Sequence, residues 1–179
     1  FAHRAAAMLD LARRRRELAR DLERKDEELA RLRRAAVLIS SRAGLEETLQ
    51  AILRMALEVT GARYGIFRLV EPPGRLVTRA VVGEELTSPL VEALPLEPGS
   101  ITGWVALNRR SMCIADLRSE PWAGLYYPLD RRLEMRAELA VPLLGASGRL
   151  EGVLNLESPE PGAFGEADRQ LLETLAVQA

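Results

Sequence analysis

The sequence predicts an α+β fold: a central antiparallel sheet of five to six strands with helices on both faces, preceded by a long coiled-coil helix. The clearest pattern is at the C-terminal end, where two apolar segments, 137–144 and 149–156, flank the turn residues 145–148. A loop with two prolines and two glycines ends the second strand, and a helix begins at Glu166. A hairpin that runs straight into an amphipathic helix is typical of an α+β sheet domain.

Earlier segments supply the remaining helices and strands. Apolar residues recur at helical spacing over residues 45–60, and Gly61 is well placed to end this helix. Shorter helical pieces are predicted around 89–94 and 101–108. The two long helices of the domain should cover one face of the sheet, while the shorter pieces and the loop 116–136 roof the other. The remaining strands are expected at 64–70, 76–82 and 111–115.

The first forty residues repeat apolar side chains every seven positions. Eight of the ten a and d sites between Met8 and Ile39 are apolar, and Arg15 and Lys25 are the exceptions. Because one helix cannot bury so narrow a stripe, residues 1–40 are predicted to form a coiled coil with a second copy of the chain, ahead of a globular domain at 41–179. The alternative is a helix that folds back onto its own domain. The predicted dimerisation residues are Leu11, Leu18, Leu22, Leu29, Leu32 and Ile39.

Composition and charge exclude several classes of protein. The chain of 179 residues carries a net charge of −1, and arginines alternate with acidic residues in the N-terminal helix, so no nucleic-acid partner is expected. No apolar run approaches the roughly 20 residues that span a bilayer, so no membrane contact is expected either. A single cysteine is typical of a reducing cytoplasm. The chain begins at Phe1 and ends within a predicted helix, and we therefore expect it to be part of a longer protein.

Catalytic and metal-binding patterns are sparse. The one histidine, His3, lies in the predicted coiled coil, so the globular domain has no Ser–His or Cys–His nucleophile pair. HExxH, CxxC and Walker-type motifs are missing from the sequence, and His and Cys are too few for a protein-ligated zinc site. We expect no catalytic residues and no metal site in this chain.

Several separated segments, in order, resemble the GAF domain, a family of small-molecule-sensing modules in bacterial signalling proteins. They are GSITGWVALNRRSMCIADLRSEP from Gly99, AELAVPLL, GRLEGVLNLES and FGEADRQLLETLAVQA. The resemblance covers about residues 45–179. It implies an antiparallel sheet with helices on one face and, where a ligand binds, a cavity under the loops of the other.

The resemblance also argues against particular cofactors, and the cofactor stays unknown. Bilin-binding members attach the chromophore through a cysteine commonly followed by histidine, whereas Ile114 follows Cys113 here. Haem-binding members use a histidine ligand, which this domain lacks. The NKFDE-type motif of cyclic-nucleotide binders is missing, and the free methionine sulfoxide reductases of this fold need several cysteines. Cys113 is therefore predicted to be a buried core thiol, with a redox or ligand-attachment role as the alternative.

Aromatic residues gather in the segments expected to roof the sheet, and Asp116 and Arg136 bracket the variable loop there. One interpretation is a mostly apolar ligand pocket with a few polar contacts. The other is that the tryptophans fill the core, the tyrosines lie at the surface and Asp116 only caps the loop. The candidate ligand-binding residues are Trp104, Cys113, Asp116, Trp122, Tyr126 and Tyr127.

Two functions from different classes follow. The first is a sensory or regulatory module of a larger signal-transduction protein, such as a sensor histidine kinase, that dimerises through its helices and passes a ligand signal along them. The second is a ligand-free spacer that dimerises and relays between neighbouring domains.

Overall fold

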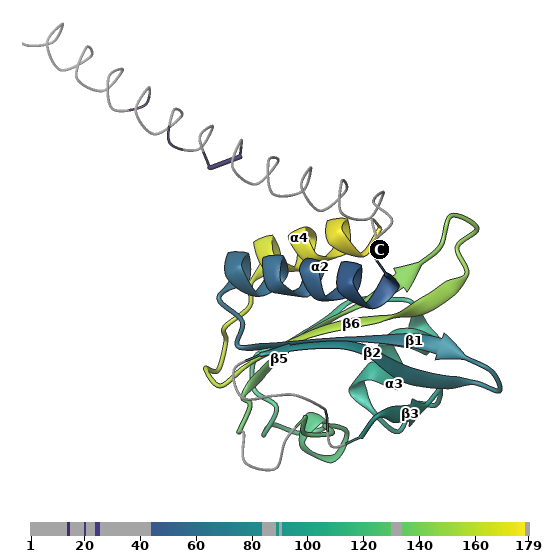
Figure 1. Ribbon diagram of the computed structural model, residues 1–179. Helices are drawn as coiled ribbons and strands as arrows, with labels where there is room; N and C mark the ends of the chain where they lie inside the picture. The colour runs from purple at the N-terminus through teal and green to yellow at the C-terminus, as the bar shows by residue number, and fades with distance from the viewer. Residues whose placement is uncertain are drawn as a thin grey trace, which may run out of the picture.

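The computed structural model of the protein describes residues 44–83, 89, 91–129 and 134–177, together with Arg14, Arg20, Arg24 and Lys25. Within these residues, six strands form one antiparallel sheet in the order β3-β2-β1-β6-β5-β4 (Figure 1), which confirms the predicted α+β class. The strands are β1 (Tyr64–Glu71), β2 (Arg75–Gly83), β3 (Ala93–Pro95), β4 (Met112–Ile114), β5 (Ala137–Leu144) and β6 (Leu150–Ser158). The helices are α2 (Leu45–Thr60), α3 (Ile101–Asn108), the 3-10 helix η1 (Trp122–Gly124) and α4 (Glu166–Ala176).

Strand β6 lies in the middle of the sheet, between β1 and β5, and its side chains alternate between two covered faces. Leu154 and Leu156 point toward α2 and α4, and we call this face the helix side. Val153, Asn155 and Glu157 point to the opposite face, which we call the roof side. All five are buried, so β6 contributes leucines to the core of the helix side and mainly polar residues to the roof side.

The helix side holds the main apolar core. Helices α2 and α4 lie next to each other across this face (Figure 1), and both have apolar residues at helical spacing. Gly61 ends α2 in the left-handed conformation (φ 71°), with its N–H 2.9 Å from the Leu57 carbonyl oxygen. The core includes Leu49, Ile52 and Leu53 of α2, Leu172 and Leu175 of α4, and Phe67, Leu139, Val141, Leu154 and Leu156 of the sheet.

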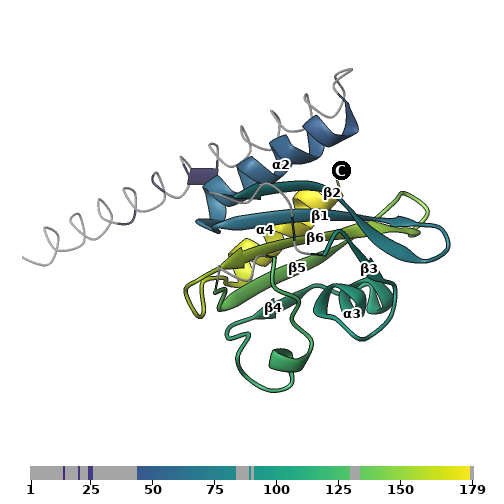
Figure 2. The same ribbon diagram turned by 60° about the horizontal axis from the view of Figure 1, so that its bottom comes forward.

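The roof side is covered by α3 and by the loop that follows β4 (Figure 2). The Ser100 side chain caps α3 by accepting a hydrogen bond from the Gly103 N–H at 2.9 Å. A Cβ atom at Gly103 would lie 2.0 Å from the Glu97 carbonyl oxygen, so only glycine allows this close turn into the helix. Val105 and Ala106 then pack against the sheet in one of the two apolar clusters on this side.

The prediction of a helical piece at 89–94 is wrong. The described residues there are not helical, and Ala93–Pro95 instead forms the edge strand β3 against β2. Leu94 is buried on the roof side, while Pro95 ends the short strand at the sheet edge, a position where the missing N–H of proline is tolerated. The other predicted helices and strands are present with boundaries shifted by a few residues, and the helix predicted at 101–108 is confirmed.

The predicted coiled coil and its dimerisation residues lie outside the described residues. Only Arg14, Arg20, Arg24 and Lys25 are described in that segment, and all four are helical and exposed. Among the described residues, no helix has the length and apolar character needed to cross a bilayer.

Two leucines of α2 test the assignment of the helix side. Leu53 is completely buried, whereas Leu45 is 56% exposed. We expect Leu53→Ala to lower the free energy of unfolding by about 2–5 kcal/mol, because it removes buried contacts and leaves a cavity. The matched change Leu45→Ala should cost less than about 0.5 kcal/mol. Urea unfolding followed by circular dichroism measures both, and equal costs for the two variants would contradict this packing.

Candidate ligand-binding site

Two of the predicted site residues, Trp122 and Tyr126, meet on the roof side. Both are half-buried in an apolar cluster that includes Tyr64 and Ile66 of β1 and Ile101 at the start of α3. Their loop is held to the helix by a hydrogen bond from the Ile101 N–H to the carbonyl oxygen of Leu125 at 3.1 Å. The prediction that these two aromatic residues lie over the sheet is therefore confirmed in its geometry, while their contact with a ligand stays a prediction.

The other aromatic candidates lie apart from this pair. Trp104 packs in the second apolar cluster of the roof side, around Leu76 and Leu94. Tyr127 is 46% exposed.

Cys113 is exposed, so the prediction of a buried core thiol is wrong. It lies on the edge strand β4 opposite Leu139 and points to the helix side, where its Sγ is 3.4 Å from the Phe164 carbonyl oxygen. Partial burial, together with the negative charge of Asp168, raises the pKa of the thiol. A thiol with a raised pKa is a poor nucleophile at neutral pH.

Asp116 and Arg136 close the base of the variable loop. The Arg136 guanidinium donates to both carboxylate oxygens of Asp116, from Nε at 3.1 Å and from Nη2 at 2.7 Å. These bonds and one from the Arg118 N–H lower the pKa of Asp116 to about 2. Asp116 therefore holds the two ends of the loop together through Arg136, and whether it also contacts a ligand stays a prediction.

A row of buried polar side chains crosses the roof side between the two apolar clusters. Glu138 of β5 lies directly opposite Glu157 of β6, and Asn155 is two residues from Glu157 on the same face. Arg68 reaches this face from β1, and Thr102 approaches it from α3. All five are at most 5% exposed. We call them the polar cluster.

Hydrogen bonds connect the polar cluster to the layer above it. Asn155 Nδ2 donates to Glu138 Oε1 at 2.5 Å and lies 3.2 Å from Thr102 Oγ1. The Tyr126 hydroxyl donates to Glu157 Oε2 at 2.7 Å. Both glutamates thus have a neutral hydrogen-bond partner, and the sheet is linked to α3 and to the loop.

Burial disfavours the charged forms of these groups. It raises the pKa of Glu138 to about 7, against smaller opposing effects of Asn155 and Arg68. Burial, followed by the charge of Glu138, raises the pKa of Glu157 to about 8. Burial also lowers the pKa of Arg68, although both glutamates oppose this shift, and it raises the pKa of Tyr126. The two carboxyl groups therefore change protonation near neutral pH.

Four buried polar atoms of the roof side have no hydrogen-bond partner among the described residues. They are Tyr64 Oη, Arg68 Nε, Thr78 Oγ1 and Asn155 Oδ1. Buried polar atoms are nearly always paired, and leaving one unpaired costs about 1–3 kcal/mol. In native proteins such atoms are usually completed by ordered water, an ion or a ligand.

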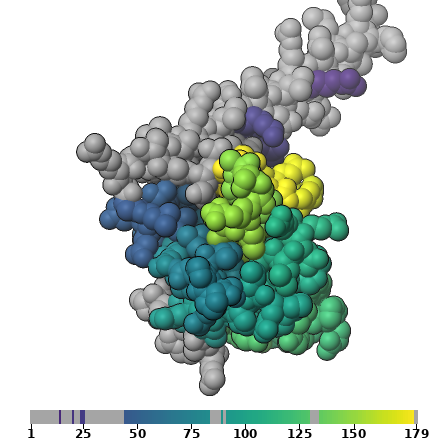
Figure 3. All heavy atoms as spheres, turned by 90° about the vertical axis from the view of Figure 1, so that its right-hand side faces the viewer, coloured from purple at the N-terminus to yellow at the C-terminus, as the bar shows by residue number. Residues whose placement is uncertain are grey.

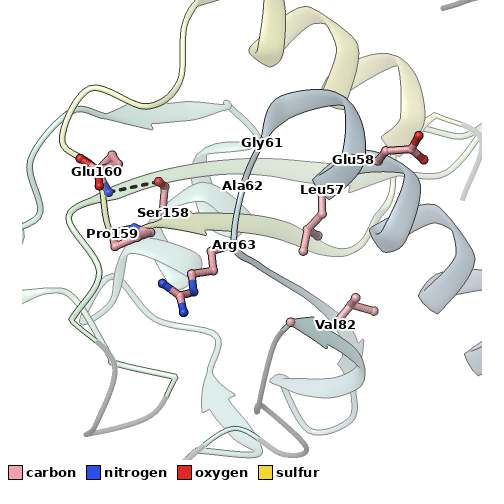
Figure 4. Close-up of a pocket in the computed structure, with 10 residues that line it drawn as sticks. Leu57, Glu58, Gly61, Ala62, Arg63, Val82, Ser158, Pro159 and Glu160 are labelled. Carbon is pink, nitrogen blue, oxygen red and sulfur yellow. Dashed lines mark hydrogen bonds between the residues drawn. The ribbon is translucent and has the colours of Figure 1, made fainter.

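Two surface pockets elsewhere have no unpaired buried polar atom among their lining residues. One of about 740 Å³ lies beyond the end of α2 and is lined by Leu57, Val82 and the loop at Ser158 (Figure 4). The Ser158 hydroxyl there already accepts a hydrogen bond from the Glu160 N–H at 3.2 Å. Another, of about 390 Å³, lies between α4 and the start of the β5–β6 turn, which are neighbours at this end of the molecule (Figure 3). Neither contains one of the unpaired buried atoms among its lining residues.

The sequence-based prediction missed the whole polar cluster. A signal for part of it is present, because Glu138 is the single charged residue inside a strand expected to be buried on both faces. Arg68 interrupts an apolar strand in the same way. Their meeting on one face depends on the pairing of β1, β6 and β5, which no local pattern reports.

The domain is therefore an antiparallel sheet with two helices on one side and a largely buried polar face under a short helix and loops on the other. The family model for the GAF domain matches residues 42–179, and the chain therefore belongs to the GAF domain family. Domains of this family are regulatory or sensory modules.

Solved structures with the same fold come from diverse proteins. The GAF domain of an Acinetobacter phosphoenolpyruvate-protein phosphotransferase is 21% identical, with 85% of this chain and 89% of that chain covered and a TM-score of 0.73. A proposed GAF sensor protein from Burkholderia vietnamiensis is 21% identical over 86% and 91% of the two chains, with a TM-score of 0.70. The free methionine-R-sulfoxide reductase of Neisseria meningitidis, solved with its substrate, is 21% identical over 82% of each chain, with a TM-score of 0.69. At this identity the likeness concerns the fold alone. No curated protein matches the sequence.

The raised pKa values of Glu138 and Glu157 predict an unusual dependence of stability on pH. Because the folded state binds these protons more tightly than the unfolded state, whose carboxyl pKa is near 4.5, stability should fall as pH rises from about 5 to 8. The expected loss is on the order of a few kcal/mol. Urea midpoints at several pH values measure it.

The variant Glu157→Gln should flatten this decline, because the amide has no proton to lose. Glu160→Gln provides the matched control at an exposed position near the end of the same strand, and it should keep the slope of the unaltered protein. A stability that rises steadily between pH 5 and 8 would contradict the protonated state of the glutamate pair.

Proposed function

We propose that the chain is the sensory module of a larger cytoplasmic signal-transduction protein, a sensor histidine kinase of a two-component system, and that it binds a small polar ligand on the roof side. The observation that carries the ligand-binding part is the polar cluster, with its ionisable side chains and unpaired buried atoms. Ligand binding there would change the contacts that the sheet makes with α3 and with the loop after β4. The strands that carry the polar cluster, β1, β5 and β6, also contact α2 and α4 through their other face.

A regulatory role fits the side chains better than the reductase chemistry of some neighbours. Proteins with this fold include free methionine-R-sulfoxide reductases. This chain has one cysteine, and Cys113 points to the helix side, on the opposite face of the sheet from the polar cluster. Its raised pKa also keeps the thiol protonated at neutral pH. We therefore assign the chain no catalytic step.

The signal would leave the domain through its helices. The heptad pattern of residues 1–40 supports a homodimer in which two N-terminal helices pair, and in this proposal α4 would lead toward an output domain. Such a helix pair can have two packing arrangements, and a ligand that binds one of them more tightly shifts the equilibrium toward it.

A sensor should be stabilised by its ligand, and this separates it from a ligand-free spacer. We expect a thermal-shift screen against polar metabolites to find a compound that raises Tm. At a concentration one hundred times Kd the stabilisation is about 2.7 kcal/mol, which corresponds to roughly 5–10 °C for a domain of this size. A screen without any stabilising compound would favour the spacer.

The variant Trp122→Ala then locates the site. Trp122 is half-buried and lies in the short 3-10 helix η1, outside the sheet and the long helices, so the variant should stay folded but bind the compound at least about tenfold more weakly, as for a truncated aromatic contact. Leu107→Ala, an exposed position on α3, should bind as the unaltered protein does. Unchanged affinity in Trp122→Ala would place the ligand elsewhere.

The coiled coil makes a separate prediction about mass in solution. The chain has a mass of 19.8 kDa and should elute as a dimer of twice that mass in size-exclusion chromatography with light scattering. Leu29→Lys introduces a charge at a predicted a site and should give the monomer. Glu27→Lys, at a position facing away from the seam, should stay dimeric. A monomeric unaltered chain at high concentration would refute the pairing.

A further inference from the structure

We propose that Glu138 and Glu157 together bind the protonated amine of the ligand, at the position that the Tyr126 hydroxyl now occupies. This inference rests on the proposed function and deepens it, because it gives the chemical class of the ligand.

The two carboxyl groups meet because of the sheet register. Glu138 and Glu157 are directly paired on β5 and β6, and they are 2% and 3% exposed. Opposite residues of an antiparallel pair have Cβ atoms about 4.5–5.5 Å apart, and like charges there oppose strand pairing. A pair of this kind is stable only if a proton or a cation sits between the carboxyl groups.

The described cations of the protein do not fill this position. Arg68 feels the charge of both glutamates but forms no ion pair within 4.0 Å to either of them among the described residues. Its Nη2 donates instead to the Val91 carbonyl oxygen at a long 3.5 Å, and its Nε has no partner. The groups that do touch the carboxyls, Asn155 and Tyr126, are neutral donors.

Few other charged or titratable groups face the pair. Tyr64 of β1 and Tyr126 of the loop are the phenols on this side, and the sequence of α3, Ile101–Asn108, contains no charged residue. Cys113 of β4 points to the other face. The pair and Arg68 are thus the only described charges of the polar cluster.

An ammonium group fits this arrangement better than a metal ion or an anion does. It brings one positive charge and three hydrogen-bond donors, enough for both carboxylates and for the unpaired Oδ1 of Asn155. Ca²⁺ and Mg²⁺ prefer six or more oxygen ligands, and Zn²⁺ prefers Cys and His. Two carboxylates beside Arg68 do not supply such a shell, and no three-residue acidic or His/Cys group is found among the described residues. An anion would lie next to the carboxylates of Glu138 and Glu157, which would repel it.

Tyr126 is the group that the amine replaces. Its hydroxyl comes from the loop rather than from the sheet, and it forms a neutral hydrogen bond to Glu157 Oε2. A hydrogen bond between an ammonium and a carboxylate is charge-assisted and roughly twice as strong. Binding also releases the proton that the carboxyl pair holds near neutral pH, so affinity should rise with pH until about 8.

The experiment uses the whole chain and two sets of probes, L-α-amino acids and simple alkylamines such as butylamine, each with its N-acetylated counterpart. N-acetylation removes the positive charge of the amine and leaves the rest of the molecule unchanged apart from the added acetyl group. We expect the amines to raise Tm and the acetylated compounds to have no effect. Titration calorimetry of a stabilising amine should show affinity rising between pH 6 and 8 with proton release. If amino acids bind and alkylamines do not, loss of binding on N-acetylation of the amino acids still supports the amine site.

Three variants separate binding from folding. Glu157→Gln should weaken amine binding at least tenfold, while Glu160→Gln should leave it unchanged. Tyr126→Phe removes the competing hydroxyl and should bind the amine several-fold more tightly, an effect that loss of structure would not produce. Thermal unfolding of each variant confirms that it is folded.

The outcomes separate this inference from the proposed function. If the metabolite screen finds a stabiliser without an amine, and its affinity is the same in Glu157→Gln, the sensory function stands and the amine site is refuted. Amines that bind equally well after N-acetylation refute it too. If neither the metabolites nor the amines stabilise the chain, both proposals fail.

Discussion

The pairing register of β5 and β6 is the constraint on which the rest of the structure depends. Side chains alternate along a strand, so this register sends Leu139 and Leu156 to the helix side and Glu138 and Glu157 to the roof side. A shift of one residue in one strand would place charged groups under α2 and α4 and expose leucines to the polar layer. The apolar core and the polar cluster are therefore two consequences of one arrangement, and neither can change without the other.

The sequence predicted those parts of the fold that local patterns determine. The β5–β6 hairpin follows from two strand-like segments around a four-residue turn, and α2 follows from apolar residues at helical spacing that end at Gly61. The segment 89–94 was predicted wrongly because it is short and has no clear periodicity. Its fold depends on the free edge of β2, to which Ala93–Pro95 pairs. Tertiary contacts decide such segments rather than their own propensity.

The candidate site was predicted only in part, for a related reason. Trp122 and Tyr126 stand out in a chain with few aromatic residues, and their place in an irregular loop suggested a cover for the sheet. The polar cluster draws its members from β1, β5, β6 and α3, which are far apart in the sequence. A charged residue in an apolar strand indicates that something is unusual at that position. It does not indicate that Glu157 will lie opposite Glu138, since this follows from pairing.

In the proposed function, the polar cluster would also link stability to ligand binding. A pair of buried carboxyl groups with unpaired neighbours lowers stability relative to an apolar core of the same volume. In the empty domain a proton removes part of this cost, but the unpaired atoms of Asn155 and Arg68 keep theirs. A ligand that pairs these atoms would form its hydrogen bonds only in the folded state. The more unpaired polar atoms the ligand pairs, the more it would stabilise the folded domain. Because Asn155 also bonds to Thr102 of α3 and Glu157 to Tyr126 of the loop, this energy acts on the elements that cover the site. Those elements, rather than the packed helix side, are therefore where the bound and empty domains should differ first.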